Sequence, residues 1–109
     1  MKKTLILCFC LTISVLASAQ VYVDGVRLEP DNTGNYMEVD PMFRTDGTCA
    51  FRVDYGQAEP REDFLSDSFG KTLDFRSLVH GLNFLYSNGW ELAEATVVGT
   101  NRRYLLKRR

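Results

Sequence analysis

The chain has 109 residues and a formal charge of −1, with 25% charged and 45% hydrophobic residues. This length predicts a single domain. The near-neutral charge excludes the strong positive field expected of a nucleic-acid-binding protein.

The first 19 residues have the pattern of a secretory signal peptide. Two lysines precede an uncharged apolar run over residues 4–17, which ends in the small-residue motif Ala17-Ser18-Ala19. We predict cleavage before Gln20. A membrane anchor is disfavoured because a span needs about 20 apolar residues. A lipoprotein signal at Cys8 is disfavoured because the apolar stretch before it is shorter than the roughly 7–15 residues that a signal needs.

Cleavage would leave residues 20–109 as the mature chain, which we predict to be one domain. It removes two lysines and no acid, so the formal charge falls from −1 to −3, and Cys49 becomes the only cysteine. Because one cysteine cannot form an internal disulfide, Cys49 is predicted to be a buried thiol or half of an intermolecular bridge. Cys49 and His80 alone fall short of the four ligands of a zinc site. We therefore predict no metal and no cofactor.

Residues 20–56 are predicted to form the N-terminal strands. Asp24-Gly25 between two short β-rich pieces indicates a hairpin. Residues 36–39 form a candidate strand that Asp40-Pro41 would stop. The run from Thr48 to Tyr55 alternates, which places Cys49 on the inner face of a half-buried strand. Residues 57–72 are polar and predict a mobile loop that ends in a turn.

The clearest periodicity predicts an amphipathic helix over residues 73–89, capped by Thr72 or Asp74 and ended by Asn88-Gly89. Its apolar stripe, counted from Phe75, comprises Phe75, Leu78, Val79, Leu82, Leu85 and Tyr86. The same count places Leu73, His80 and Phe84 on the opposite face. That face is a candidate interaction surface, because an aromatic residue is unusual on a solvated helix back. The alternative is that residues 64–69 fold over the helix and cover Phe84.

Residues 90–109 are predicted to form a C-terminal β-hairpin. Trp90 directly follows the glycine that ends the helix, a position that commonly packs back onto the last helical turn. We favour this structural role over a ligand-binding tryptophan. Five bases gather at the end of the chain and could contact an anion: Arg102, Arg103, Lys107, Arg108 and Arg109. The favoured alternative is that these charges protect an edge strand from pairing with another chain.

The predicted fold is therefore α+β: a single antiparallel sheet of about four to six strands with one long helix packed on one face. The segments "FRVDYGQ" (51–57) and "LNFLYSNGWEL" (82–92), with the final "YLLKRR" (104–109), resemble those of uncharacterised small exported proteins of Bacteroides-type bacteria. They are also similar to a small bacterial domain family of unknown function marked by a "GWELV" turn, although Ala93 replaces the valine. The resemblance implies the fold and an envelope location, and it brings no catalytic or ligand residues.

The remaining chemistry is sparse. A Cys49–His80 nucleophile is disfavoured because the helix would lie between the two residues. Glu91 and Glu94 would point to opposite faces of a strand, so they make no obvious acid–base pair. We therefore predict a non-enzymatic, periplasmic or secreted binding module that contacts a protein partner or a second copy. It would have no nucleic-acid partner and no stable membrane anchor. The alternatives are a small periplasmic enzyme or ligand sensor with an unidentified carboxylate site, and a structural subunit of an envelope assembly.

Overall fold

The computed structural model describes residues 20–58 and 63–109. The predicted signal peptide, residues 1–19, lies outside the described part, as does part of the predicted loop. The described elements, in chain order, are β1 (Tyr22–Val23), β2 (Val26–Arg27), α2 (Pro30–Thr33), β3 (Tyr36–Phe43), β4 (Cys49–Asp54), β5 (Leu65–Ser66), α3 (Leu78–Ser87), β6 (Trp90–Val98) and β7 (Asn101–Arg108).

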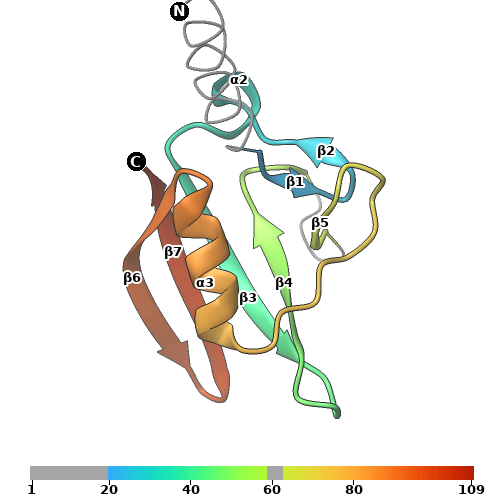
Figure 1. The fold of residues 1–109 in the computed structure, drawn as a ribbon. Helices are drawn as coiled ribbons and strands as arrows, with labels where there is room; N and C mark the ends of the chain where they lie inside the picture. The colour runs from blue at the N-terminus through green and yellow to red at the C-terminus, as the bar shows by residue number, and fades with distance from the viewer. Residues whose placement is uncertain (1–19, 59–62) are drawn as a thin grey trace, which may run out of the picture.

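The strands form two antiparallel sheets rather than one. The main sheet has four strands in the order β4-β3-β7-β6, and a small sheet has three in the order β2-β1-β5. Helix α3 and the small sheet lie over one face of the main sheet (Figure 1). The prediction of a single sheet with one long helix is therefore wrong: the described chain is mostly β, and its helices have four and ten residues.

The missed sheet is built from strands too short to show a period. Asp24 and Gly25 both adopt positive φ, 49° and 81°, and make the predicted hairpin turn between β1 and β2. The third strand, β5, lies inside the segment predicted as a mobile loop. Its Leu65 is completely buried and pairs with Val23. The hairpin of β1 and β2 was predicted, but β5 has only two residues and leaves no alternation in the sequence, so the sequence pattern could not reveal the strand that completes this sheet.

The helix is shorter than predicted because its first five expected residues, 73–77, are not helical. Phe75 and Cys49 exchange two backbone hydrogen bonds of 2.8 Å, so this segment runs along β4 instead of coiling. Ser77 is the N-cap, and its Oγ accepts a hydrogen bond from the His80 amide at 3.1 Å. The C-terminal end is confirmed: Asn88 is the C-cap, and Gly89 follows with a φ of 94°.

Strand β3 continues through Pro41, where the sequence predicted a stop. Pro41 pairs with Phe51 of β4, while the pairing between β3 and β7 ends at Val39. At Pro41 the strand therefore has a partner on one side only, a position where a missing N–H is tolerated. The predicted inner face of β4 is confirmed, since Cys49, Phe51 and Val53 are all fully buried, whereas Ala50 of the predicted outer face is buried as well, at 2% exposure.

Candidate interaction surface

The predicted helix face of Leu73, His80 and Phe84 does not lie on the outside of the helix. Leu73 precedes α3, and its amide donates to the Leu65 carbonyl at 2.9 Å. Leu73 and Phe84 are partly buried and pack against the core. The centroids of the Phe84 and His80 rings lie 5.4 and 5.5 Å from that of Phe75. His80 and Phe84 therefore gather beside Phe75, and contact of the three residues with a partner stays a prediction.

The helix phase was misplaced because Phe75, the origin of the count, is not helical. The buried residues of α3 are Gly81 and Leu85, whereas Val79 and Tyr86 of the predicted core stripe are exposed. The ring of Phe84 contacts that of Phe75, and Phe69 is 94% exposed, so Phe69 does not cover Phe84. Cover by the rest of the segment 64–69 stays a prediction. The helix is rotated so that Gly81, which has no side chain, faces the sheet.

Replacing Phe84 with aspartate should destabilise the monomer by about 2–4 kcal/mol, because it removes an aromatic contact and places a carboxylate against the core. Urea unfolding followed by circular dichroism measures the change. Val79→Asp, on the exposed side of the same helix, is the control and should change stability by less than about 0.5 kcal/mol. A variant at Phe84 that unfolds like the wild type would show that this ring adds nothing to the core.

The five C-terminal bases do not form one patch. Lys107 lies 3.5 Å from Glu91, and Arg103 lies 3.7 Å from Glu38. On the other face of β7, the Arg108 guanidinium lies 4.7 Å from the centre of the Trp90 ring and donates to the Gly34 carbonyl and the Thr33 hydroxyl. The Arg109 guanidinium lies 4.2 Å from the centre of the Tyr86 ring. Arg102 is exposed and shares its face of β7 with Arg108.

The alternative prediction, that these bases protect an edge strand, is wrong because β7 is not an edge strand. Strand β7 lies inside the main sheet, between β3 and β6. Its outward-facing bases instead take part in ion pairs across neighbouring strands, joined on the same face by Arg52 and Asp40 at 2.5 Å. The exposed pairs of Arg103 and Lys107 contribute about 0–1 kcal/mol each, so they keep the outer face polar more than they stabilise it. The Arg52–Asp40 pair is partly buried. Binding of an anion by these bases stays a prediction.

Cys49 and His80 make separate contacts. The thiol is fully buried and donates a weak 3.7 Å hydrogen bond to the Ala50 carbonyl. His80 Nδ1 accepts from the Arg76 amide at 3.1 Å. Across residues 20–58 and 63–109, no three His, Cys, Asp or Glu side chains gather in a way that could hold a metal ion.

We expect Cys49 to react slowly with a thiol reagent in the native protein and promptly after unfolding. Burial raises the pKa of the thiol. Because the folded-state pKa is raised, protonation of the thiol stabilises the folded protein. This stabilisation is fully present below the unfolded pKa of about 8.5 and is lost as the pH rises through the folded-state pKa. The stability of Cys49→Ala should therefore fall less at alkaline pH than the stability of the wild type. Labelling of the native and urea-unfolded protein, with unfolding curves at several pH values, tests both statements; rapid native labelling would contradict them.

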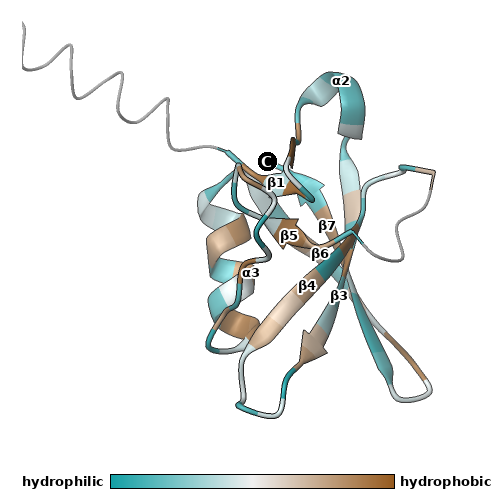
Figure 2. Ribbon diagram, turned by 90° about the vertical axis from the view of Figure 1, so that its right-hand side faces the viewer, coloured by the Kyte–Doolittle hydropathy of each residue, from teal (hydrophilic) through white to brown (hydrophobic). Residues whose placement is uncertain are grey.

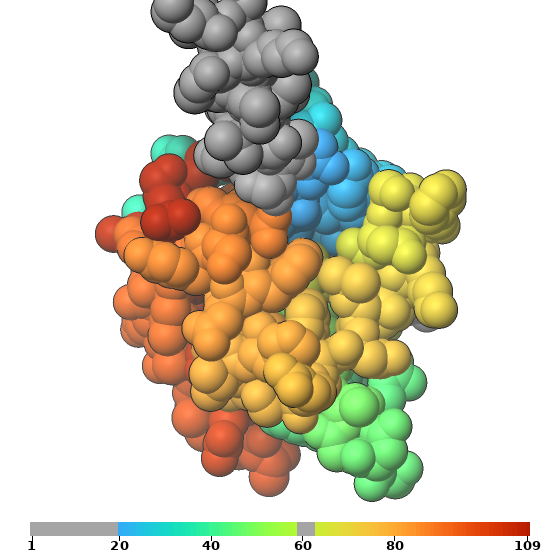
Figure 3. Space-filling view, in the orientation of Figure 1, coloured from blue at the N-terminus to red at the C-terminus, as the bar shows by residue number. Residues whose placement is uncertain are grey.

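The most unusual surface is strand β6, which the sequence identified as a strand but could not place at an edge. Trp90 at its start is buried, Glu91 is half-buried, and every residue from Leu92 to Val98 is exposed. Val97 and Val98 are 67% and 59% exposed. Figure 2 shows hydrophobic residues near the tip of the β6–β7 hairpin, away from α3, and Figure 3 shows the tip projecting beyond the helix.

The two edges of the main sheet differ. The outer side of β4 is partly covered, since Val53 donates to the Asp63 carbonyl and Cys49 pairs with Phe75. Strand β6 pairs with β7 on one side, and in the described part of the chain no strand lies along its other side. A register shift at Leu92/Glu94 marks a bulge, beyond which the strand continues to Val98. A long, exposed, apolar edge strand is a template for pairing with another chain.

Once the strand order is known, the composition of β6 shows that little protects its edge. The β6 segment "WELAEATVV" contains two acids and neither a lysine nor a proline, the residues that usually protect an edge. The described helices include none long and apolar enough to cross a membrane. Comparison of the chain with protein-family models, curated proteins and solved structures finds no match. The surface must therefore be interpreted from its own chemistry.

Proposed function

We propose that this protein is an exported, non-enzymatic interaction module that binds an extended segment of a protein partner along β6. The observation that carries the proposal is the outer edge of β6, which no strand of the described residues pairs with and which combines nine strand residues with exposed apolar side chains. In strand addition, backbone hydrogen bonds supply affinity and alternate side chains supply specificity. Export is supported by the signal-peptide pattern of residues 1–19.

The two faces of β6 define the chemistry of the partner strand. On the face that carries Trp90, the register places Leu92, Ala95 and Val97. On the outer face, Glu91 and Glu94 are the only charged residues of the strand. Strand β7 already places Lys107 opposite Glu91, whereas Glu94 has no ion pair within the described residues. The partner strand should therefore alternate apolar residues with lysine or arginine, because opposite charges across strands stabilise pairing.

A photo-reactive amino acid placed at Val97 tests this proposal in cells of the native host. We expect a discrete cross-linked species between this protein and a second protein, and peptide mass spectrometry should place the contact in an extended segment with alternating basic and apolar residues. The same probe at Phe69, an exposed aromatic residue of the turn after β5, is the control for accessibility and should not give that species. A ladder of self-linked copies would favour the envelope-subunit alternative. Identical products at both positions, or none at Val97, would reject the proposal.

An edge-blocking substitution provides a second test. Val97→Lys places a charge among the apolar positions of the edge, a device by which natural sheets prevent pairing. Because Val97 is exposed, the fold should be retained, and a cross-link from a probe at the neighbouring Val98 should be lost. Val79→Lys, an exposed valine on α3, is the matched control and should leave the cross-link unchanged. A cross-link that persists in Val97→Lys would show that the partner does not use the β6 edge.

A further inference from the structure

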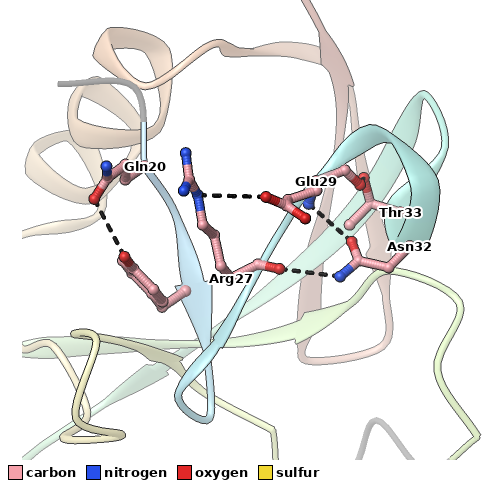
Figure 4. Close-up of polar contacts among 6 residues, drawn as sticks. Gln20, Arg27, Glu29, Asn32 and Thr33 are labelled. Atoms are coloured by element: carbon pink, nitrogen blue, oxygen red, sulfur yellow. Dashed lines mark hydrogen bonds and ion pairs between the residues drawn. The ribbon is translucent and has the colours of Figure 1, made fainter. Parts of the chain in front are cut away.

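Gln20 is the residue at which signal cleavage is predicted to create a new N-terminus, and it is held in the fold by two hydrogen bonds. Its backbone N donates to Asn88 Oδ1 at 3.1 Å. Its side-chain Oε1 accepts from the Tyr22 hydroxyl at 3.2 Å, as the dashed line from Gln20 in Figure 4 shows. The side-chain Nε2 makes no hydrogen bond within the described residues.

Asn88 is oriented to receive a donor at this position. Its Nδ2 donates to the Phe84 carbonyl at 2.8 Å, which leaves Oδ1 as the acceptor facing Gln20. Gln20 is half-buried. A free α-ammonium here would carry three N–H groups, of which the structure pairs one, and placing an incompletely paired charge in a half-buried position costs free energy.

We infer that the exported chain begins with pyroglutamate formed from Gln20, and that this lactam docks on Asn88 at the end of α3. The neutral α-amine attacks Cδ of its own side-chain carboxamide. The N–Cδ bond forms, the Cδ–Nε2 bond breaks, and Nε2 takes an amine proton and leaves as ammonia. The lactam keeps one N–H and the Oε1 carbonyl, the two groups that are hydrogen-bonded in the fold, and it loses the group that is not.

The inference depends on export and not on strand pairing, so it can fail independently of the proposed function. The full chain should be expressed in a host that exports it, and the exported protein analysed by N-terminal peptide mass spectrometry and Edman sequencing. We expect a peptide starting at position 20 that is lighter by one ammonia than the free-glutamine form. Edman sequencing should read no first residue until pyroglutamyl aminopeptidase has acted. The variant Q20A, processed in the same way, should be readable at once. A readable glutamine at the first cycle, or a chain start elsewhere, would overturn the inference.

Docking of the lactam has its own measurement. Pyroglutamyl aminopeptidase should remove it slowly from the native protein and rapidly from the unfolded one. Asn88→Ala removes the acceptor and should speed native removal by about fivefold, the effect of one hydrogen bond of about 1 kcal/mol. Asn83→Ala, at an exposed site on the same helix, should leave the rate unchanged. Tyr22→Phe removes the other contact without altering the helix cap, and it should also speed removal. Equal rates in wild type, Asn88→Ala and Tyr22→Phe would show that the chain start is not docked.

Discussion

Replacing Trp90 with alanine should lower the free energy of unfolding by about 3–5 kcal/mol, the usual effect of emptying a large buried aromatic site. Trp90 is 2% exposed and belongs to the main core cluster. It also supports the Arg108 guanidinium, which in turn donates to Thr33 and Gly34 at the end of α2. The loss therefore reaches from the end of α3 to the segment before β3. Urea unfolding followed by far-ultraviolet circular dichroism measures it without relying on tryptophan fluorescence.

The chain contains a matched control for this prediction. Tyr86 also lies under an arginine, Arg109, at 4.2 Å, but it is an exposed residue on the surface of α3. Tyr86→Ala should therefore cost about 0.5–1 kcal/mol, the value of an exposed cation–π contact. Equal losses at both sites would mean that the arginine contact, and not burial, accounts for the stability. A Trp90→Ala variant that unfolds like the wild type would make a surface-binding role for Trp90 the better explanation.

Replacing Gly81 with alanine should destabilise the protein by about 1–3 kcal/mol, the range of overpacked cores. In an exposed helix the same change would stabilise by about 1 kcal/mol, so the sign of the effect identifies the cause. A Cβ at position 81 would lie 2.4 Å from Cζ of Phe51 and 3.1 Å from Cδ2 of Phe75. Because Phe51 is fully buried between the sheet and α3, its ring cannot move without disturbing the core.

Two measurements separate this steric effect from other causes. Asn83→Ala, at an exposed position of α3, should be neutral or slightly stabilising. Phe51→Leu removes part of the ring that would collide, so the double variant with Gly81→Ala should lose less stability than the two single losses combined. Strict additivity in this cycle would show that the two residues do not compete for the same space.

The sequence predicted the elements whose signals are local. Asp24-Gly25 predicted a hairpin turn, the alternation from Cys49 predicted the buried face of β4, and Asn88-Gly89 predicted the end of α3. Each depends on backbone preferences or on a period within a few residues. The prediction of one sheet was wrong because the pairing of β1 with β5 joins segments about 40 residues apart in the chain, and two-residue strands carry no pattern of their own.

The candidate surface was missed for a related reason. Alternation distinguishes the two faces of a strand, but it cannot tell a central strand from an edge strand. The bases of β7 suggested an exposed edge, and only the order β4-β3-β7-β6 reveals that β6 occupies it. The helix face was misplaced because the periodic count began at Phe75, a residue that pairs with Cys49 in extended conformation. Because the count took its core direction from a residue outside the helix, the predicted core face was rotated away from the face that packs on the sheet.

The position of β7 has a consequence for the order in which the protein can fold. Residues 101–108 form the last strand of the sequence, yet they lie between β3 and β6 and pair with both. Until this strand has been synthesised, no strand joins the β3–β4 hairpin to β6, and the four-stranded main sheet cannot form. Contacts between distant parts of a chain form slowly, because the entropy cost of closing the loop comes before the stabilising contacts are made. A growing chain of this topology therefore cannot complete its main sheet until residues 101–108 have been made.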